Sequence, residues 1–318
     1  MKTPVLVLFG PTASGKTELL EKLFGTGLLR AEIISADSMQ VYRGMDIGTA
    51  KPSAAERARI PHHLIDIKNA DEQFNAGEFV RLAEEACAAA AGRGALPVVS
   101  GGTGFYLKNL VMGLGEAPPS DLAVRQILKD ELSVRGAASL MEELTRADPV
   151  SASRIHINDE YRLLRALEVY RLTGRPLSSY ASPWNKESGS VQDSAFRFLL
   201  IGLRRSREDI YRRINARAAA MFRAGLPGEV KRLFEAGYTP SDPGLRAIGY
   251  REFFVEENGA WRLLEDMTGV QALVAQNSRR YAKRQITFFS SIPNVKWIDC
   301  GKGDTAVIER EIRAFLDC

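Results

Sequence analysis

Short apolar runs alternate with helix-like segments over the first hundred residues. Such runs are typical of strands that are buried on both faces of a parallel sheet. We expect helices between the runs and one late strand, and this alternation predicts an α/β fold with a parallel sheet flanked by helices. The expected strands are residues 5–9, 31–35, 64–67, 96–100 and 198–203, and the expected helices are residues 17–24 and 76–91.

The pattern changes in the middle of the chain. Residues 118–121 have the chemistry of a linker followed by a helix start. Amphipathic helical segments follow without a strand-like run, and polar residues 182–194 are expected to form a loop. The chain is expected to be mostly helical from Glu208 onward. We therefore predict an α/β core of residues 1–114 and 196–318 that carries an all-helical insertion of residues 115–195.

The composition fits a soluble globular protein. Of the 318 residues, 45% are apolar and 26% are charged. No stretch approaches the roughly 20 apolar residues that a membrane-spanning helix needs. The first apolar run, at residues 5–9, is too short for a secretory signal. We therefore expect a cytoplasmic protein without membrane association.

Cysteine usage and net charge narrow the function only slightly. Cys87, Cys300 and Cys318 lie far apart and form no CxxC pair, so neither a disulfide framework nor a zinc site is indicated. Lys and Arg exceed Asp and Glu by 43 − 39 = 4. An excess this small does not establish nucleic-acid binding, which depends on where the basic residues gather.

The strongest motif follows the first expected strand. Residues 10–17 match G-x-x-x-x-G-K-[ST] between a strand and a helix, the context that a P-loop requires. Backbone N–H groups and the helix N-terminus would surround a phosphate, Lys16 adds a charge, and Thr17 offers a hydroxyl to Mg²⁺. The motif indicates a diphosphate or triphosphate ligand without identifying ATP. The expected phosphate-binding residues are Gly10, Pro11, Thr12, Ala13, Ser14, Gly15, Lys16 and Thr17.

Two polar residues follow other expected strands. Asp37 comes just after residues 31–35, and Thr103 follows the double glycine after residues 96–100. Both are therefore expected at the carboxyl edge of the sheet, where open α/β folds bind ligands. Asp37 could ligate magnesium or accept a proton there. Each residue could also cap the helix that follows it.

His62 and His63 are adjacent and precede Asp66. Two neighbouring histidines rarely face one metal ion, so a structural or phosphate-edge role is favoured over a metal site.

Basic residues gather in three places. Near the end of the chain, Arg279, Arg280, Lys283 and Arg284 fall at helical spacing, with aromatic residues close by. Such a face is either solvated or an RNA contact that uses guanidinium groups for phosphate and rings for unstacked bases. The two other candidate patches are Arg246 with Arg251, and Arg162 with Arg165.

Blocks in order along nearly the whole chain resemble the bacterial tRNA isopentenyltransferase family. The P-loop comes first, and Ser35–Pro52 is the most specific block. The remaining blocks are residues 61–66, 101–107, 158–159, 162, 165–168, 248–250 and 281–287. The resemblance implies transfer of a dimethylallyl group from dimethylallyl diphosphate to N6 of adenosine 37 in certain tRNAs, with Mg²⁺ and without ATP. It also implies a P-loop core and a helical insertion that grips the anticodon stem.

The resemblance also implies roles for individual residues. Asp37 would be the base, Lys16 would stabilise the departing diphosphate, and Thr103 would face the reacting centre. Ser38, Met39 and Gln40 would read the target base, which must be splayed out of its stack. The residues expected to bind tRNA are Asp37, Ser38, Met39, Gln40, Thr103, Arg125, Tyr161, Arg162, Arg165, Arg246, Gly249, Tyr250, Arg251, Lys283, Arg284, Gln285 and Thr287.

The sequence departs from the family pattern at three positions. Ile157 stands where the family usually has proline, and Phe288 and Ser290 stand where it usually has tryptophan and arginine. One RNA-facing cation is thereby lost, which affects the details of tRNA contact rather than the chemistry.

Other functions fit parts of the sequence. An adenylate isopentenyltransferase shares the chemistry, but the helical insertion and the basic helix argue against it. A small-molecule P-loop kinase is compatible with the P-loop alone. An RNA-binding GTPase is disfavoured because the sequence has no N-K-x-D motif. We expect the protein to act as a monomer.

Overall fold

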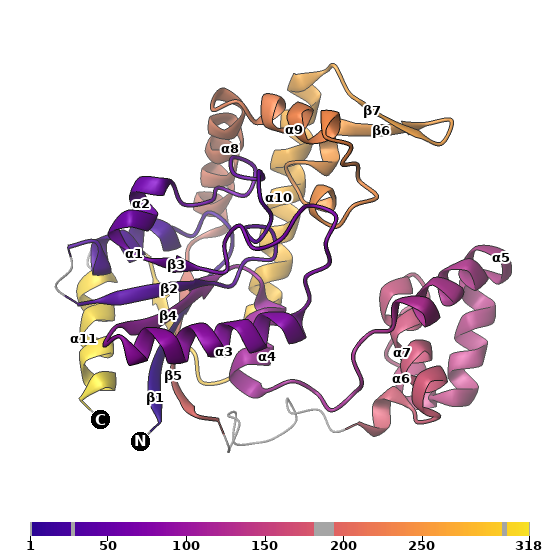
Figure 1. The fold of residues 1–318 in the computed structure, drawn as a ribbon, viewed down its shortest axis with the longest axis horizontal. Coiled ribbons are helices and arrows are strands. Elements are labelled where there is room, and N and C mark those ends of the chain that lie inside the picture. The colour runs from indigo at the N-terminus through magenta and orange to yellow at the C-terminus, as the bar shows by residue number, and fades with distance from the viewer. Residues whose placement is uncertain (1, 27–28, 181–193, 301–303, 318) are drawn as a thin grey trace. The chain divides into compact units, whose positions relative to one another are not determined.

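The computed structural model of the protein describes residues 2–26, 29–180, 194–300 and 304–317 (Figure 1). The chain divides into two compact units, one formed by residues 1–111 and 192–318 and the other by residues 112–191. These divisions lie within a few residues of the boundaries predicted from the sequence. Among the described residues, no helix has the length and apolar character needed to cross a membrane.

A six-stranded sheet forms the centre of the first unit (Figure 1). Its strand order is β3-β2-β4-β1-β5-β8, and every pair of neighbours is parallel. The prediction of an α/β class with a parallel sheet is thereby confirmed. The strands are β1 (Thr3–Phe9), β2 (Ala31–Ser35), β3 (His62–His63), β4 (Leu96–Gly101), β5 (Phe196–Arg204) and β8 (Lys296–Asp299).

Helices pack on both faces of this sheet. Leu6 and Leu8 of β1 belong to a buried cluster that includes Leu20 of α1 (Lys16–Phe24) and Ile308 of α11 (Asp304–Leu316). Successive strand residues face opposite sides, so this cluster defines one face. Helix α3 (Ala76–Gly92) packs on β2 and β4 without joining that cluster, and it covers the other face. The two shorter helices of this region are α2 (Ala54–Arg59) and α4 (Gly104–Met112).

A second buried cluster joins the segment after β2 to elements from the last third of the chain. Val41 and Met45 pack with Val230 of α9, Val270 of α10 and Phe253. This cluster fixes the segment that begins at the carboxyl end of β2, although its partners lie far away in the sequence. The elements concerned are α8 (Arg207–Arg223), α9 (Leu226–Glu235), α10 (Met267–Phe289), the hairpin β6 (Phe254–Glu257) and β7 (Ala260–Leu263), and the short helices η3 (Gly244–Arg246) and η4 (Arg251–Phe253).

The described elements of the second unit are all helical. Asp121 caps its longest helix by accepting hydrogen bonds from the N–H groups of Ala123 and Val124. That helix is interrupted at Gly136, whose backbone is not helical, with φ at 76°. Leucines of the first and third helices form the buried core. The elements are α5 (Leu122–Ala147), α6 (Pro149–Ala152), α7 (Glu160–Thr173) and η1 (Leu177–Ser179). Most of the loop predicted at residues 182–194 lies outside the described residues.

The structure corrects two predictions about strands. Residues 64–67 are not a strand, because Leu64 and Asp66 have φ values of 61° and 57°, which extended backbone excludes. Regular pairing in this region is confined to His62 and His63 of β3. The region after Glu208 is largely helical, but it also contains β6, β7 and β8, which the apolar pattern did not predict.

Candidate functional site

The P-loop spans the turn from β1 to α1. Gly15 has φ at 98°, a left-handed conformation that residues with a Cβ rarely adopt, and it starts α1 directly. The Nζ atom of Lys16 donates to the carbonyl oxygens of Gly10 and Pro11, at 2.9 and 3.1 Å. Thr17 is exposed at the first turn of the helix. The loop therefore has the geometry expected of a phosphate cradle.

Arginines that the sequence did not predict donate hydrogen bonds to the backbone of this loop. Arg205, after β5, donates to the carbonyl oxygen of Ser14 at 2.7 Å. Arg213 of α8 donates to the carbonyl oxygen of Ala13 at 2.8 Å. Arg217 lies one turn further along α8, and its guanidinium lies close to Asp37 and Lys16. The spacing of Arg213 and Arg217 places them on one helix face, which is the only local signal that could have indicated them.

Opposite charges are crowded where the P-loop meets Asp37. Burial, assisted by the nearby Arg217 and opposed by Asp37, lowers the pKa of Lys16 to about 8. Burial also lowers the pKa of Arg217, again opposed by Asp37. Lys16, Arg217 and Asp37 therefore interact electrostatically within one small volume, as a charged ligand with a reacting group beside it requires.

Asp37 sits in a turn rather than at the start of a helix. Its Oδ1 atom accepts hydrogen bonds from the backbone N–H groups of Met39 and Gln40, at 2.9 and 3.4 Å. From the other side, the Thr103 hydroxyl accepts from the N–H of Ser38 at 3.0 Å. The two residues that follow β2 and β4 thus hold the same turn, as their positions at one sheet edge predict. The alternative of a helix cap at Asp37 is wrong, since residues 38–41 form turns.

Two cavities meet at Asp37. The P-loop cavity, about 480 Å³ in volume, is lined by Lys16 and Thr17 among others. The inner cavity, about 300 Å³, has an apolar wall from α8 and α10 that includes Ile214, Met221 and Val274. The residues lining both cavities are Thr12, Asp37, Thr49, Arg217 and Tyr281. A group bound at the P-loop and a group bound in the inner cavity would therefore meet beside Asp37.

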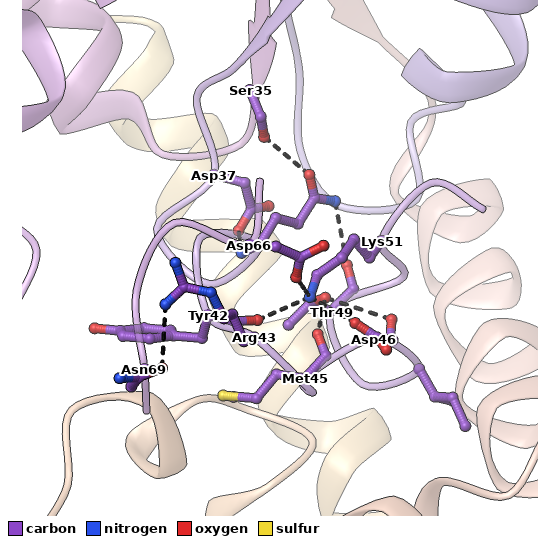
Figure 2. Close-up of polar contacts among 12 residues, drawn as sticks. Ser35, Asp37, Tyr42, Arg43, Met45, Asp46, Thr49, Lys51, Asp66 and Asn69 are labelled. Atoms are coloured by element: carbon purple, nitrogen blue, oxygen red, sulfur yellow. Dashed lines mark hydrogen bonds and ion pairs between the residues drawn. The ribbon is translucent and has the colours of Figure 1, made fainter. Parts of the chain in front are cut away.

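The segment from Asp37 to Lys51, called the acid loop below, is held by a buried lysine. Figure 2 shows Lys51 pointing into the loop, where Nζ contacts Asp46 and Asp66 at 2.6 and 2.5 Å and donates to the carbonyl oxygen of Tyr42 at 2.8 Å. The Lys51 side chain is only 2% exposed. Near the start of the loop, the Gln40 amide accepts from the Ser35 hydroxyl at 2.9 Å.

A buried carboxylate of α9 also bonds the backbone of the acid loop. Glu229 is 2% exposed. It accepts from the backbone N–H groups of Asp46, Ile47 and Gly48, at 3.1, 2.9 and 3.2 Å. The Tyr250 hydroxyl donates to it at 2.6 Å, and burial together with this carboxylate raises the pKa of Tyr250. These contacts fix the loop that carries Asp37, Ser38, Met39 and Gln40.

The basic face predicted near the end of the chain lies on α10. Arg280, Lys283, Arg284 and Thr287 line a shallow groove together with Phe288 and Ser291. Arg279 lies apart from the groove, since it donates to Asn215 at 2.5 Å. Arg246 and Arg251 are exposed, and Arg251 stacks over Trp261 at 4.5 Å. Gly249 lines the inner cavity near them. Their contact with tRNA stays a prediction.

Two residues predicted to touch tRNA are instead interior. Tyr250 is 0% exposed and bonded to Glu229, and Gln285 is 6% exposed with both ends of its amide bonded to backbone. A direct tRNA contact by either side chain does not fit this burial, so we correct both assignments. The family resemblance led to both assignments, and the contacts show that the two side chains support neighbouring loops.

The insertion residues predicted to bind tRNA fall into two groups that differ in exposure. Tyr161 and Arg162 are exposed on α7, and Arg162 pairs with Asp159 at 3.2 Å. Arg125 and Arg165 instead pair with the fully buried Glu168, at 3.1 and 3.0 Å. Arg125 thereby holds α5 against α7, Arg165 pairs within α7, and only the first group is mainly exposed.

The histidine pair has structural partners. His62 contacts the carbonyl oxygen of Ile60 at 2.6 Å, and His63 contacts Glu32 at 2.7 Å. Within the described residues, no group of three or more His, Cys, Asp or Glu side chains is arranged to hold a metal ion. These contacts agree with the structural role that the sequence favours.

Comparison with known proteins identifies the relatives of this chain. A sequence model described as IPP transferase matches residues 40–292. A tRNA dimethylallyltransferase of Geobacter sulfurreducens is 43% identical over 94% of this chain and 92% of its own. A tRNA isopentenylpyrophosphate transferase structure from Bacillus halodurans has a TM-score of 0.65 and 34% identity, covering 100% of this chain and 97% of that one. A eukaryotic dimethylallyltransferase captured acting on tRNA has a TM-score of 0.74 and 26% identity, covering 98% and 78%.

Proposed function

Because the chain belongs to the IPP transferase family, we propose that it transfers the dimethylallyl group of dimethylallyl diphosphate to N6 of adenosine 37 in tRNA. It is a prenyltransferase that modifies tRNA, as its relatives are. One observation carries the finer proposal: Asp37 lies where the P-loop cavity and the inner cavity meet.

The P-loop cavity takes the diphosphate of the donor. Backbone N–H groups of the loop and the Lys16 ammonium face the phosphate oxygens, and the dimethylallyl carbon chain points toward Asp37. Arg217 adds a second positive charge on the same side. These charges stabilise the diphosphate as it departs, because the negative charge on its bridging oxygen grows when the bond to carbon breaks.

The inner cavity receives the flipped-out adenine. The amine N6 attacks the allylic carbon, a carbon–nitrogen bond forms, the carbon–oxygen bond breaks, and diphosphate leaves with the bonding electrons. The N6 proton passes to the Asp37 carboxylate, which must lie within hydrogen-bond reach of the amine. Ser38 and Met39 line this cavity beside Asp37 and are placed to contact the base.

A divalent metal ion fits the donor set on the P-loop cavity. Thr17 supplies a hydroxyl and Asp37 supplies carboxylate oxygens on the same cavity, and oxygen ligands with phosphate are what Mg²⁺ prefers. We propose that Thr17 holds Mg²⁺, which when bound neutralises charge on the diphosphate.

The acceptor is long enough to touch several surfaces. We propose that the anticodon stem lies on the exposed basic residues of α10 and on Tyr161 and Arg162 of the insertion. Both cavities are built within one chain, so we propose that the protein acts as a monomer. Its tRNA substrate assigns it to the cytoplasm.

The test uses radiolabelled dimethylallyl diphosphate, purified protein and an anticodon stem-loop with adenosine at position 37. We expect label in the RNA with the native chain, and a loss of at least about 100-fold in kcat with Asp37→Ala. Replacing adenosine 37 with guanosine is expected to abolish incorporation.

Failure of label to enter any RNA bearing adenosine 37 would refute the proposal. If free AMP outcompeted the stem-loop as acceptor, an adenylate isopentenyltransferase would be favoured instead. Consumption of ATP in place of dimethylallyl diphosphate would indicate a P-loop kinase.

A further inference from the structure

Gln285 of α10 joins two loops that reach the site from different strands. Its Oε1 atom accepts from the backbone N–H of Thr12 at 2.8 Å, and its Nε2 atom donates to the carbonyl oxygen of Gly102 at 2.7 Å. Thr12 belongs to the P-loop after β1, and Gly102 directly precedes Thr103 after β4. One side chain therefore ties the phosphate cradle to the loop that holds the Asp37 turn.

The chemistry of these two partners selects glutamine. A backbone N–H needs an acceptor and a carbonyl needs a donor. Among straight-chain side chains of this length, only the primary amide of glutamine carries both at its end at neutral pH. Glutamate would set a carboxylate oxygen against the Gly102 carbonyl, and methionine, similar in length, would leave both partners without a bond. Because Gln285 is 6% exposed, water cannot readily replace either partner.

The residues around the Gln285 amide leave just enough space for it. A Cβ atom on Gly102 would lie 2.6 Å from Nε2 of Gln285, so residue 102 must be glycine for the amide to approach. Tyr281, one turn earlier on α10, lies near both Thr103 and Gln285. Gln285, Tyr281 and Thr103 thus form a connected set that ends at the turn of Asp37.

We propose that Gln285 is a positioning residue, which fixes the distance between the P-loop and the Thr103 loop and so holds the diphosphate in line with Asp37. It lines the P-loop cavity at its edge and acts through its bonds to Thr12 and Gly102. The kinetic part of this inference rests on the proposed function, whereas the effect on pyrophosphate binding does not.

The experiment compares the native chain with Gln285→Met and Gln285→Glu. Titration calorimetry with inorganic pyrophosphate and Mg²⁺ gives the Kd of the P-loop for pyrophosphate. A second titration gives the Kd for the anticodon stem-loop, and label transfer gives kcat. Val80→Ala is the matched control: Val80 is a buried residue of α3, 6% exposed, and lines neither cavity.

For Gln285→Met we expect pyrophosphate to bind about tenfold more weakly, because two buried hydrogen bonds that shape the loop are lost. We expect kcat to fall about 100-fold, since a misplaced donor reacts poorly, while the stem-loop Kd stays within about twofold. Gln285→Glu should be at least as impaired, because its charge also repels the diphosphate. Val80→Ala should lower the Tm by a similar amount and leave all three quantities near native.

Several results would overturn the inference. Native pyrophosphate affinity and kcat in Gln285→Met would mean that the side chain only fills space. Equal losses in Val80→Ala would mean that overall stability alone matters. A parallel loss of stem-loop binding in Gln285→Met would mean that Gln285 contributes to RNA binding. If the native chain transfers no label, the proposed function fails, but the pyrophosphate titrations still decide the positioning role.

Discussion

Lys16 is placed to lose its charge within an accessible pH range. Burial, assisted by Arg217, lowers its pKa to about 8, so the ammonium is charged below that pH and neutral above it. We therefore expect the affinity for pyrophosphate to fall as pH rises through about 8, approaching roughly a tenfold loss per pH unit well above it. Calorimetry from pH 6.5 to 10 measures this.

Lys16→Met is the control for that titration, because pyrophosphate itself changes charge over the same range. The ratio of native to variant affinity isolates the lysine: it should be constant below pH 7 and decline above 8. A ratio that stays constant to pH 10 would mean that Lys16 keeps its proton in the free protein.

At the residue scale, the sequence predicted those site residues that follow strands of the sheet. The P-loop with Lys16 follows β1, Asp37 follows β2 and Thr103 follows β4, and parallel strands bring such positions to one edge. Arg217 was not predictable in this way, because it lies mid-helix on α8. Its direction is set by Ile210 and Ile214, which pack with Ala282 of α10, and no local pattern reveals that rotation.

At the scale of elements, α9 determines the shape of a loop to which it is not adjacent in sequence. The Glu229 carboxylate accepts from three successive N–H groups of the acid loop and from Tyr250. In Glu229→Gln the amide nitrogen would face donors it cannot bond. We expect the free energy of unfolding to fall by about 2–4 kcal/mol, and stem-loop affinity to fall with it.

Urea unfolding of Glu229→Gln and Glu235→Gln provides the comparison. Glu235 lies on the same helix, but its side chain is 62% exposed and pairs with Lys231 at 3.7 Å. Its substitution should change stability by less than about 0.5 kcal/mol. Indistinguishable midpoints for the two variants would show that the acid loop does not depend on this carboxylate.

The sequence predicted elements whose own residues show a clear apolar pattern. It did not predict elements that depend on contacts with residues far away in the chain. The apolar run at residues 64–67 looks like a strand, but Asp66 turns back to bind Lys51 and Arg57, at 2.5 and 2.9 Å. Strand β8 is short and half-exposed, so it has no apolar run, and it exists because β5 offers it an edge. Ion pairs override the strand propensity of residues 64–67, whereas pairing with β5 makes a strand of β8 in spite of its weak pattern.

At the scale of the molecule, the helical insertion separates two parts of the chain that nevertheless pair in one sheet. Helix α4 ends at Met112 and β5 begins at Phe196, yet β5 pairs with β1 along its length, from Thr3 with Phe196 to Phe9 with Gly202. The insertion has a leucine core of its own, contributed by α5 and α7. Each unit therefore buries its own apolar side chains, and the donor site lies wholly in the first.

This division predicts that the two binding functions can be separated. If residues 114–190 are replaced by a flexible Gly/Ser linker of roughly 12 residues, the first unit should fold and bind pyrophosphate within about threefold of the native chain. Stem-loop affinity should fall at least about tenfold, and its dependence on salt should weaken, because Arg162 and its neighbours no longer meet phosphates. Calorimetry with each ligand measures both effects. A shortened chain that bound the stem-loop as tightly as the native protein would place the whole RNA interface on α10 and the acid loop, and the insertion would then need another role.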